Sequence, residues 1–349
     1  MSHQRKKYLV TGAAGFIGSN FVHYLYQHHR DIEVIVLDKI GYSGSLQSIK
    51  ELEEYPNFTF IKGDICDPLI VAQAMAGVDV VVNFAAEAAV DRSIQEADSF
   101  LKTDILGVYI LLQEARRQKQ LKRFIQISTD EAYGQILEGS FTETSELKPR
   151  NPYAASKLGG DRLAYSFFVT YGTPIVITRA SNNYGPRAYL EKVIPLFITN
   201  LMDGLPVPIY GEGKQIRDWL FVKDHCSGID LLIEHGTNGE VYNIGGEQEL
   251  TNMDLTKRIL KLMGKDESSI KFVQDRPGHD FRYSLDCSKI KKLGWKQEYG
   301  IDEGLKETMI WYENNEPWWR NIKEQMDSRY AVGFWGETNK ESPVGGDKK

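Results

Sequence analysis

The chain has 349 residues, 42% of them hydrophobic, enough for one large or two medium domains with a substantial core. Its formal charge of -6, with both signs interspersed, gives no electrostatic basis for binding nucleic acid or an anionic membrane. No run of eighteen apolar residues occurs and the first residues lack the apolar segment of a signal peptide, so we expect a soluble, cytoplasmic protein. The three cysteines, Cys66, Cys226 and Cys287, and the seven histidines are too scattered to indicate a disulfide framework or a metal site.

A glycine-rich turn follows the first predicted strand. Residues 7–11 have the pattern of a short buried strand, and Gly12, Gly15 and Gly18 come directly after it. This spacing allows a tight turn and a close approach of the backbone to a pyrophosphate, and the next predicted helix, residues 16–27, would point its amino end at the phosphates. Glycine-rich turns are common, so the motif alone is a weak signal. Its context, a strand before and an amphipathic helix after, is the one that a dinucleotide site requires.

An acid ends the second predicted strand, residues 33–37. Asp38 stands about twenty residues beyond the last glycine of the turn, where a carboxylate accepts hydrogen bonds from an adenosine ribose and repels a 2'-phosphate. This favours NAD over NADP as the cofactor. Lys39, the next residue, is a mild counter-signal, because a cation there tolerates the phosphate.

Two more strands are predicted over residues 58–62 and 78–84. An acid after the third strand is placed to meet the adenine, and small residues after the fourth would let a cofactor lie close to the backbone. For each of these two segments, an ordinary turn with no role in cofactor binding is an equally good interpretation. The residues concerned are Asp64 and Ile65 after the third strand, and Ala85, Ala86 and Glu87 after the fourth.

The fifth predicted strand ends in a polar stretch, Ser128–Gly134, where we expect the chemistry. In open α/β sheets, ligands bind at the carboxyl ends of the strands, and this strand would deliver Thr129, Asp130 and Glu131 to that edge. The alternative is that the two acids only cap the next turn.

A tyrosine and a lysine four residues apart follow on a predicted helix. Tyr153 and Lys157 share one helix face, so the ammonium can lie close to the phenol and lower its pKa. The alternative is an ordinary solvated face.

The alternation of strands and helices predicts an α/β fold, a Rossmann-like doubly wound parallel sheet with a smaller C-terminal α/β substrate lobe. Helices are predicted over residues 68–76, 97–119 and 153–171, and a sixth strand over residues 174–178. We assign residues 1–180 to an NAD-binding domain to which some later segments return, residues 181–334 to a nucleotide-sugar-binding lobe, and residues 335–349 to a disordered tail.

Beyond residue 180 the pattern changes to turns and polar clusters. Residues 181–186 have turn chemistry, and a helix is predicted over residues 193–203. Arg217 and Arg276 would suit bidentate phosphate binding, with surface ion pairs as the alternative. A tryptophan cluster is interpreted as hydrophobic docking of the last helix rather than as a ligand platform: Trp311, Trp318 and Trp319.

These residues resemble the extended short-chain dehydrogenase/reductase family, and within it the nucleotide-sugar 4,6-dehydratases, most closely those acting on dTDP-glucose. The resemblance runs from about residue 7 to residue 319. The glycine motif and the Tyr153–Lys157 pair specify only the superfamily, whereas Thr129–Glu131 is more specific, because related epimerases and reductases usually carry small or hydroxyl residues at the two acids. Other dehydratase-like segments are residues 90–94, 181–186, 216–219 and 276–280.

The resemblance implies a role for each reacting group. Tyr153, its phenolate favoured by Lys157, would take the C4 hydroxyl proton while the C4 hydride passes to NAD, and Thr129 would hydrogen-bond the C4 oxygen. Glu131 would remove the C5 proton as general base, and protonated Asp130 would protonate the departing C6 hydroxyl. The hydride would then return to C6, which regenerates the cofactor. Neighbouring carboxyls with opposite roles need environments that separate their pKa values.

The same resemblance implies two sets of binding residues and a homodimer, with a four-helix interface built from residues 97–119 and 153–171. The cofactor set adds residues from the turn and the later strands to the glycines: Phe16, Ile17, Asp38, Lys39, Asp64, Ile65, Ala85, Ala86, Thr103, Tyr153, Lys157 and Asn183. The nucleotide-sugar set is Glu87, Thr129, Asn182, Lys192, Val193, Pro208, Tyr210, Arg217, Asn252, Arg276 and His279.

Two segments depart from the pattern of the dTDP-glucose enzymes. Ala88-Ala89 stands where they usually have Ser-His, which removes a sugar-contacting group and leaves room, and residues 185–190 differ from the usual Gly-Pro-Tyr-Gln-Phe-Pro. UDP-N-acetylglucosamine is therefore an alternative substrate, followed by UDP-glucose. A nucleotide-sugar 4-epimerase or decarboxylase, and a non-catalytic NAD- or nucleotide-sugar-binding protein, are alternative functions. The expected product would serve rhamnose or another deoxysugar.

Overall fold

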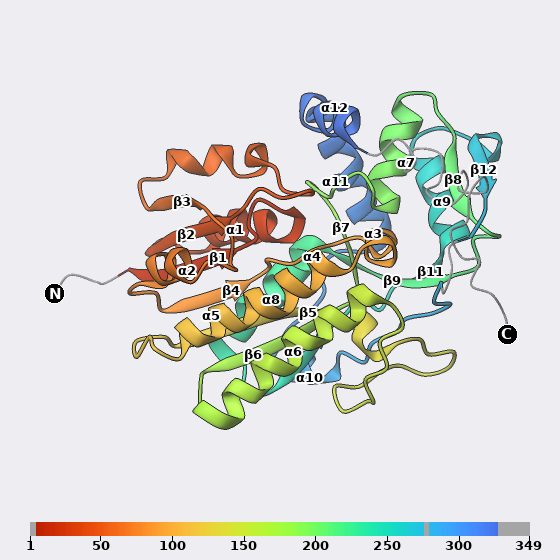
Figure 1. Ribbon diagram of the computed structural model, residues 1–349. Coiled ribbons are helices and arrows are strands. Elements are labelled where there is room, and N and C mark those ends of the chain that lie inside the picture. Colours follow the sequence, from red (N-terminus) through yellow and green to blue (C-terminus); the bar gives the residue numbers. More distant parts are fainter. Residues whose placement is uncertain (1–4, 276–278, 327–349) are drawn as a thin grey trace, which may run out of the picture.

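The computed structural model describes residues 5–275 and 279–326. One sheet has the strand order β10-β6-β5-β4-β1-β2-β3, and all neighbouring strands in it are parallel (Figure 1). The predicted doubly wound sheet is confirmed, and its connections reverse direction between β1 and β4. Its strands are β1 (Lys6–Thr11), β2 (Ile32–Asp38), β3 (Phe58–Lys62), β4 (Val80–Asn83), β5 (Arg123–Thr129), β6 (Ile175–Ala180) and β10 (Val241–Ile244).

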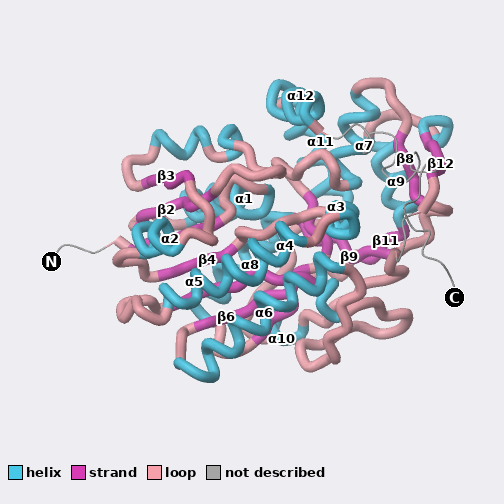
Figure 2. The backbone as a smooth tube through the Cα atoms, in the orientation of Figure 1, coloured by secondary structure: helices cyan, strands magenta, loops and turns pink. Residues whose placement is uncertain are grey.

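Helices bury both faces of this sheet (Figure 2). Side chains alternate along each strand, so Val10 of β1 joins one core and Leu9 joins the other. Burial on both sides explains the continuous apolar runs from which the strands were predicted. One face is covered by α1 (Phe16–His28), α8 (Val222–His235) and α10 (Ser288–Lys291), and the other by α2 (Pro68–Met75), α5 (Val108–Ala115) and α6 (Pro152–Tyr171).

A smaller lobe lies beyond the carboxyl ends of the central strands (Figure 1). Trp318 and Trp319 are buried in its core, and the ring of Trp311 packs 5.0 Å from that of Trp318, which confirms the docking interpretation. The lobe contains one sheet of β7 (Asn182–Tyr184), β9 (Ile216–Phe221) and β11 (Glu249–Thr251), the pair β8 (Val207–Tyr210) and β12 (Ile270–Val273), and the helices α7 (Val193–Met202), α9 (Asn252–Leu262), α11 (Ile301–Asn314) and α12 (Glu316–Gln325).

The long helix predicted over residues 97–119 is interrupted. It consists of α4 (Asp98–Leu101), a π-helical segment (Lys102–Gly107) and α5, and the short helix α3 (Val90–Gln95) precedes it. The π-helical segment packs closely on α6, since a Cβ built on Gly160 would lie 2.4 Å from the carbonyl oxygen of Asp104. Such segments are often found at functional sites.

Other boundaries also differ from the prediction. The strand expected over residues 78–84 is shorter, and residues 181–186, expected as turns only, include β7, because they pair with β9. The predicted tail, residues 335–349, lies outside the described residues. Within residues 5–275 and 279–326, no helix is both long and apolar enough to cross a membrane.

Candidate active site

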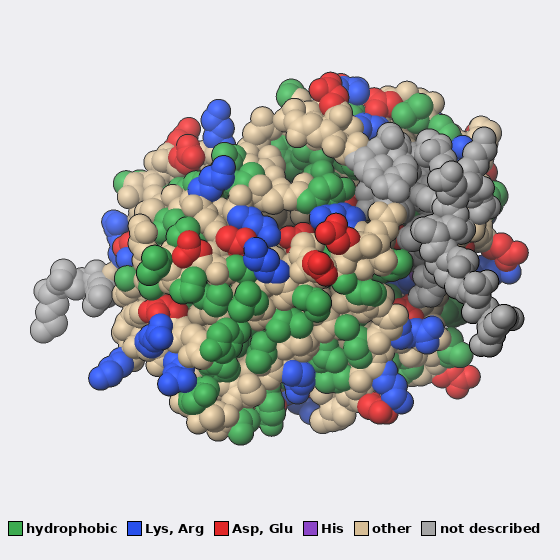
Figure 3. All heavy atoms as spheres, viewed as in Figure 1, with side chains coloured by type: hydrophobic (Ala, Val, Ile, Leu, Met, Phe, Trp, Pro, Cys, Tyr) green, Lys and Arg blue, Asp and Glu red, His purple; other side chains and the backbone are tan. Residues whose placement is uncertain are grey.

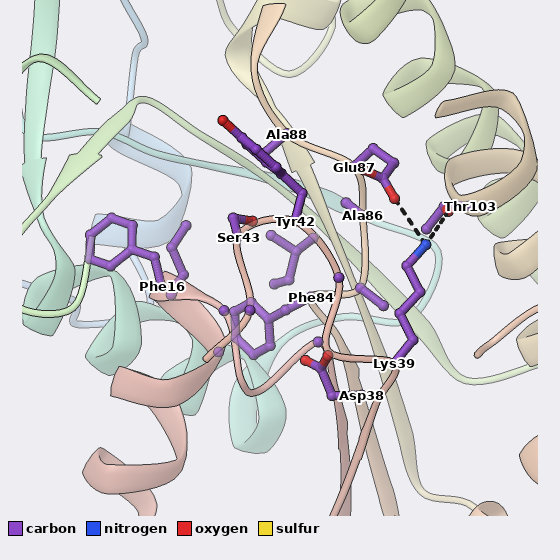
Figure 4. A pocket seen from close by; sticks show the side chains of 18 of the residues that line it. Phe16, Asp38, Lys39, Tyr42, Ser43, Phe84, Ala86, Glu87, Ala88 and Thr103 are labelled. Carbon is purple, nitrogen blue, oxygen red and sulfur yellow. Dashed lines mark hydrogen bonds and ion pairs between the residues drawn. The ribbon is translucent and has the colours of Figure 1, made fainter. Parts of the chain in front are cut away.

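A cavity of about 240 Å³ lies at the carboxyl ends of β1, β2 and β4, where the sheet connections reverse (Figure 4). Nearly all of the predicted cofactor residues line it. Asn183 does not: it lines the neighbouring cavity described below, and its side chain donates to the Ser181 carbonyl and meets His225. The predicted residues that line the first cavity are Gly12, Gly15, Phe16, Ile17, Gly18, Asp38, Lys39, Asp64, Ile65, Ala85, Ala86, Thr103, Tyr153 and Lys157.

The glycine-rich turn has no room for side chains at two positions. Gly12 has a φ of +70°, and a Cβ on it would lie 2.5 Å from the backbone nitrogen of Ala85. A Cβ on Gly18 would lie 2.5 Å from the carbonyl oxygen of Gly12. The glycines line the cavity, and α1 begins beside them at Phe16 without a side-chain cap at Gly15, so its amino end suits an anion.

Asp38 holds the turn as well as facing the cavity. Its carboxylate accepts hydrogen bonds from the backbone N–H of Ala14 at 2.9 Å and of Ile40 at 2.7 Å. Burial raises the pKa of this carboxyl, and the two backbone hydrogen bonds oppose the rise. The neighbouring Lys39 turns toward Glu87 and Thr103 (Figure 4).

A second cavity, of about 220 Å³, is formed largely by the smaller lobe and shares Glu191 and Lys192 with the first. Among the predicted nucleotide-sugar residues, Glu87 instead lines the first cavity, Thr129 lines neither, and Arg276 lies outside the described residues. Those that line the second cavity are Asn182, Lys192, Val193, Pro208, Tyr210, Arg217, Asn252 and His279.

Arg217 is a buried cation of β9, so the surface ion pair considered as its alternative is wrong. The residue is 5% exposed, and its guanidinium donates to the carbonyl oxygens of Asp280 at 2.9 Å and Phe281 at 3.3 Å. The guanidinium also lies 4.5 Å from the centre of the Tyr283 ring. These contacts fix a positive charge at the wall of the second cavity.

The predicted reacting groups come together where the two cavities approach each other. Tyr153 lines the first cavity and Glu131 lines the second. Thr129 Oγ1 donates to Asp130 Oδ1 at 3.2 Å, and Asn151 Nδ2 donates to Glu131 Oε2 at 3.0 Å. The end of β5 and the start of α6 thus place a hydroxyl, two carboxyls and a phenol around one point.

Asp130 and Glu131 have different surroundings. Asp130 is 3% exposed, and its Oδ2 has no hydrogen-bond partner among the described residues. Burial raises the pKa of Asp130 well above its usual range, and the charges of Glu131 and Asp218 raise it further. Asp130 therefore holds a proton more readily than an ordinary carboxyl, whereas Glu131 faces a cavity and accepts a hydrogen bond.

The Tyr153–Lys157 pair departs from the expectation. Burial raises the pKa of the Tyr153 phenol, the charges of Glu131 and Asp104 raise it further, and a hydrogen bond with Thr129 lowers it. Lys157 Nζ instead donates to the carbonyl oxygen of Ile127 at 2.9 Å, and burial lowers the pKa of its ammonium. The predicted lowering of the phenol pKa by Lys157 is therefore wrong in this structure, because desolvation and nearby carboxylates dominate.

Several residues that line the cavities were missed from the sequence, among them Tyr42, Tyr189 and Glu191. Tyr42 and Tyr189 line the first cavity and their rings pack 5.0 Å apart, although 147 positions separate them in the chain. Glu191 lines both cavities with buried carboxyl oxygens, and burial raises its pKa while Lys192 opposes the rise. The polar pair before an apolar helix was a usable signal for Glu191, but only Lys192 was selected.

Comparisons with known proteins agree with this geometry. The profile of the GDP-mannose 4,6 dehydratase family matches residues 9–308. A dTDP-glucose 4,6-dehydratase from Streptomyces niveus is 48% identical over 333 residues, covering 94% of this chain and 99% of that protein. One from an Actinoplanes species is 49% identical over 321 residues, covering 90% and 99%.

Solved structures give the same picture. DesIV, a dTDP-glucose 4,6-dehydratase from Streptomyces venezuelae solved with NAD and TYD bound, has a TM-score of 0.88 at 46% identity and covers 91% of this chain and 100% of its own. A UDP-glucose 4-epimerase from Thermotoga maritima with UDP-glucose has a TM-score of 0.81 at 30% identity, covering 89% and 99%.

Proposed function

Because this chain belongs to the nucleotide-sugar 4,6-dehydratases of the extended short-chain dehydrogenase/reductase family, we propose that it dehydrates a nucleotide-diphosphate hexose of the dTDP-glucose type to the 4-keto-6-deoxy sugar. One observation carries this proposal: a buried acid suited to hold a proton, Asp130, adjoins a cavity-facing carboxylate, Glu131, and the phenol of Tyr153. An elimination that follows an oxidation needs these three groups.

NAD is the proposed cofactor, and the first cavity fits it. The crowded glycines Gly12 and Gly18 bring backbone against the position of a pyrophosphate, and Asp38 stands where an adenosine ribose is bound in this fold. When bound, NAD would supply the hydride acceptor and donor and, in its oxidised form, a positive charge in the cavity that Tyr153 lines. Relatives solved with NAD support the assignment.

The chain's own residues would then move the protons. In its phenolate form, Tyr153 would accept the C4 hydroxyl proton as C4 is oxidised, and Thr129 would hydrogen-bond the C4 oxygen. Burial raises the pKa of this phenol, so the phenolate would need the positive charge of the bound oxidised cofactor to offset that rise. The resulting ketone acidifies the C5 hydrogen, which Glu131 would remove as a proton. Asp130 would give its proton to the C6 hydroxyl, which leaves as water. The burial that raises the Asp130 pKa supports its role as the acid.

The smaller lobe would hold the nucleotide diphosphate. Arg217, buried at the cavity wall, and Lys192, which lines both cavities, are the proposed partners of the diphosphate charge. On this basis residues 1–180 serve the cofactor and residues 181–334 the substrate, with β10 as a later segment that returns to the sheet.

The test is to incubate the purified protein with dTDP-glucose, without added NAD, and to follow the nucleotide sugar by mass spectrometry. The proposed dehydration removes one water. Epimerisation would leave the mass unchanged, decarboxylation would require a uronic acid and remove carbon dioxide, and a non-catalytic binding protein would leave the sugar intact.

A second candidate substrate follows from Ala88 and Ala89. Ala88 lines the first cavity, and Ala89, which has a φ of +75°, lines the second. Two small side chains in a row therefore lie between the two cavities. The room suits a bulkier group at C2, as in UDP-N-acetylglucosamine, with UDP-glucose as a further candidate. Side-by-side assays decide: much faster turnover of dTDP-glucose excludes the larger sugar as the preferred substrate.

We also propose that the enzyme is a homodimer that works in the cytoplasm and supplies rhamnose or another deoxysugar. Apolar side chains gather on the surface over α5 and α6 (Figure 3). A second copy of the chain would cover them, because burying a contiguous exposed apolar patch favours association. The exposed apolar residues of these two helices, and of α4 and the π-helical segment that precede α5, are Leu101, Leu106, Tyr109, Tyr165, Val169 and Tyr171.

A further inference from the structure

Lys39 has a defined partner in the first cavity. Its Nζ donates to Glu87 Oε1 at 2.9 Å and to Thr103 Oγ1 at 3.2 Å, and Asp64 Oδ2 lies 3.9 Å away (Figure 4). The side chain starts next to Asp38 but turns from it toward the end of β4 (Figure 4). The cation beside the ribose acid is therefore held at the opposite wall of the cavity.

Glu87 is itself fixed in place. Its side chain is 10% exposed, its backbone N–H donates to Asp104 Oδ1 at 3.0 Å, and its Oε2 accepts from Arg92 Nη1 at 3.4 Å. The two carboxylate oxygens thus have separate partners. Moving Lys39 away would leave Oε1 of a largely buried carboxylate without its cation, which costs free energy.

We infer that Glu87 sets the selectivity for NAD over NADP by holding Lys39 away from the adenosine 2' position. This rests on the NAD site of the proposed function and adds a specificity residue to it. A lysine directly after the ribose acid would otherwise offer a 2'-phosphate a cation and offset the repulsion from Asp38. To use Lys39, NADP would have to break its ion pair with Glu87.

The charged residues around Lys39 and Glu87 support the inference. Asp38, Asp64 and Glu87 outnumber the cations Lys39 and Arg92, so the cluster as a whole is negative. Glu87→Gln removes one negative charge and the strongest partner of Lys39 in a single step. Both effects favour a 2'-phosphate, and neither changes a residue that is proposed to react.

The test measures which dinucleotide the full-length protein retains. Purified protein is equilibrated with equal concentrations of NAD and NADP, passed over a desalting column, and its bound cofactor is identified by mass spectrometry. Glu87→Gln should raise the bound NADP-to-NAD ratio by roughly tenfold, about the effect of one charge-assisted hydrogen bond. Glu87→Asp, which keeps the charge but shortens the side chain, should give a smaller rise.

Two further variants test whether Lys39 causes the gain in NADP binding. Glu87→Gln combined with Lys39→Met should lose the gain, and Arg92→Met, which leaves the Lys39–Glu87 pair intact but removes a cation, should not raise the ratio. An unchanged ratio in both Glu87 variants, or a gain that survives Lys39→Met, would overturn the inference alone. Wild-type protein that retains neither dinucleotide would overturn the cofactor assignment beneath it.

Discussion

Glu131 and Asp130 are adjacent in the chain but differ in exposure and in hydrogen bonding, and this difference supports the separate steps proposed for them. Replacing Glu131 with Gln should leave C4 oxidation possible but slow removal of the C5 proton by about 10²- to 10⁴-fold, since a carboxamide cannot act as the base. Uptake of deuterium at C5 from D2O, followed by mass spectrometry, measures this step. Asp130→Asn is the control and should retain exchange while failing to release water. Undiminished exchange in Glu131→Gln would remove Glu131 from the base role.

The raised pKa of Asp130 also predicts a pH-dependent stability effect. A carboxyl whose pKa is higher in the folded state binds a proton that the unfolded chain releases, so folding loses stability as pH rises from the ordinary carboxyl range through the folded pKa. Each unit of increase corresponds to about 1.4 kcal/mol. Asp130→Asn, which mimics the neutral acid, should therefore melt higher than wild type at pH 8, with the difference disappearing near pH 4. Thermal melting across this range is the measurement, and a variant less stable than wild type at pH 8 would contradict the argument.

Among the helices, α6 matters most to the site because it carries Tyr153 and Lys157. A Cβ on Gly160 would lie 2.4 Å from the Asp104 carbonyl oxygen, which belongs to the helical backbone and cannot easily move. Gly160→Ala should therefore destabilise the fold by about 2–4 kcal/mol in urea unfolding and lower activity as α6 shifts. Gly159→Ala is the matched control: its Cβ would meet only the Ile105 side chain, so a smaller loss is expected. Equal losses in the two variants would mean that this close packing does not position the helix.

The elements predicted well from the sequence are those whose pattern reflects their burial. The strand predicted over residues 33–37 is found within β2, most of whose residues are buried, and the start of α1 at Phe16 follows from the glycine turn. The π-helical segment was not predicted, because its geometry depends on contacts with α6 rather than on its own residues.

The position of a residue in its strand or loop also decides which site residues could be predicted from the sequence and which were missed. Residues at the carboxyl end of a strand, such as Asp38 and Thr129, are identifiable because parallel strands end at one edge. Tyr42 and Tyr189 were missed because only the folded chain brings their rings together. The altered environment of Tyr153 was missed for a related reason: the carboxylate of Asp104 approaches it from the interrupted helix, where the sequence shows only a regular pattern.

At the scale of the whole molecule, the apolar surface over α5 and α6 predicts the assembly. Val169 is 62% exposed on α6, and a second copy of the chain would bury it. Val169→Asp should shift the protein from dimer to monomer in sedimentation velocity, because an interface cannot bury an unpaired carboxylate without a large cost. Leu69→Asp is the control, since Leu69 is 82% exposed on α2, outside this surface, and its replacement should leave the dimer intact. Wild-type protein that sediments as a monomer would exclude the proposed dimer, and a Val169→Asp protein that stays dimeric would place the interface elsewhere.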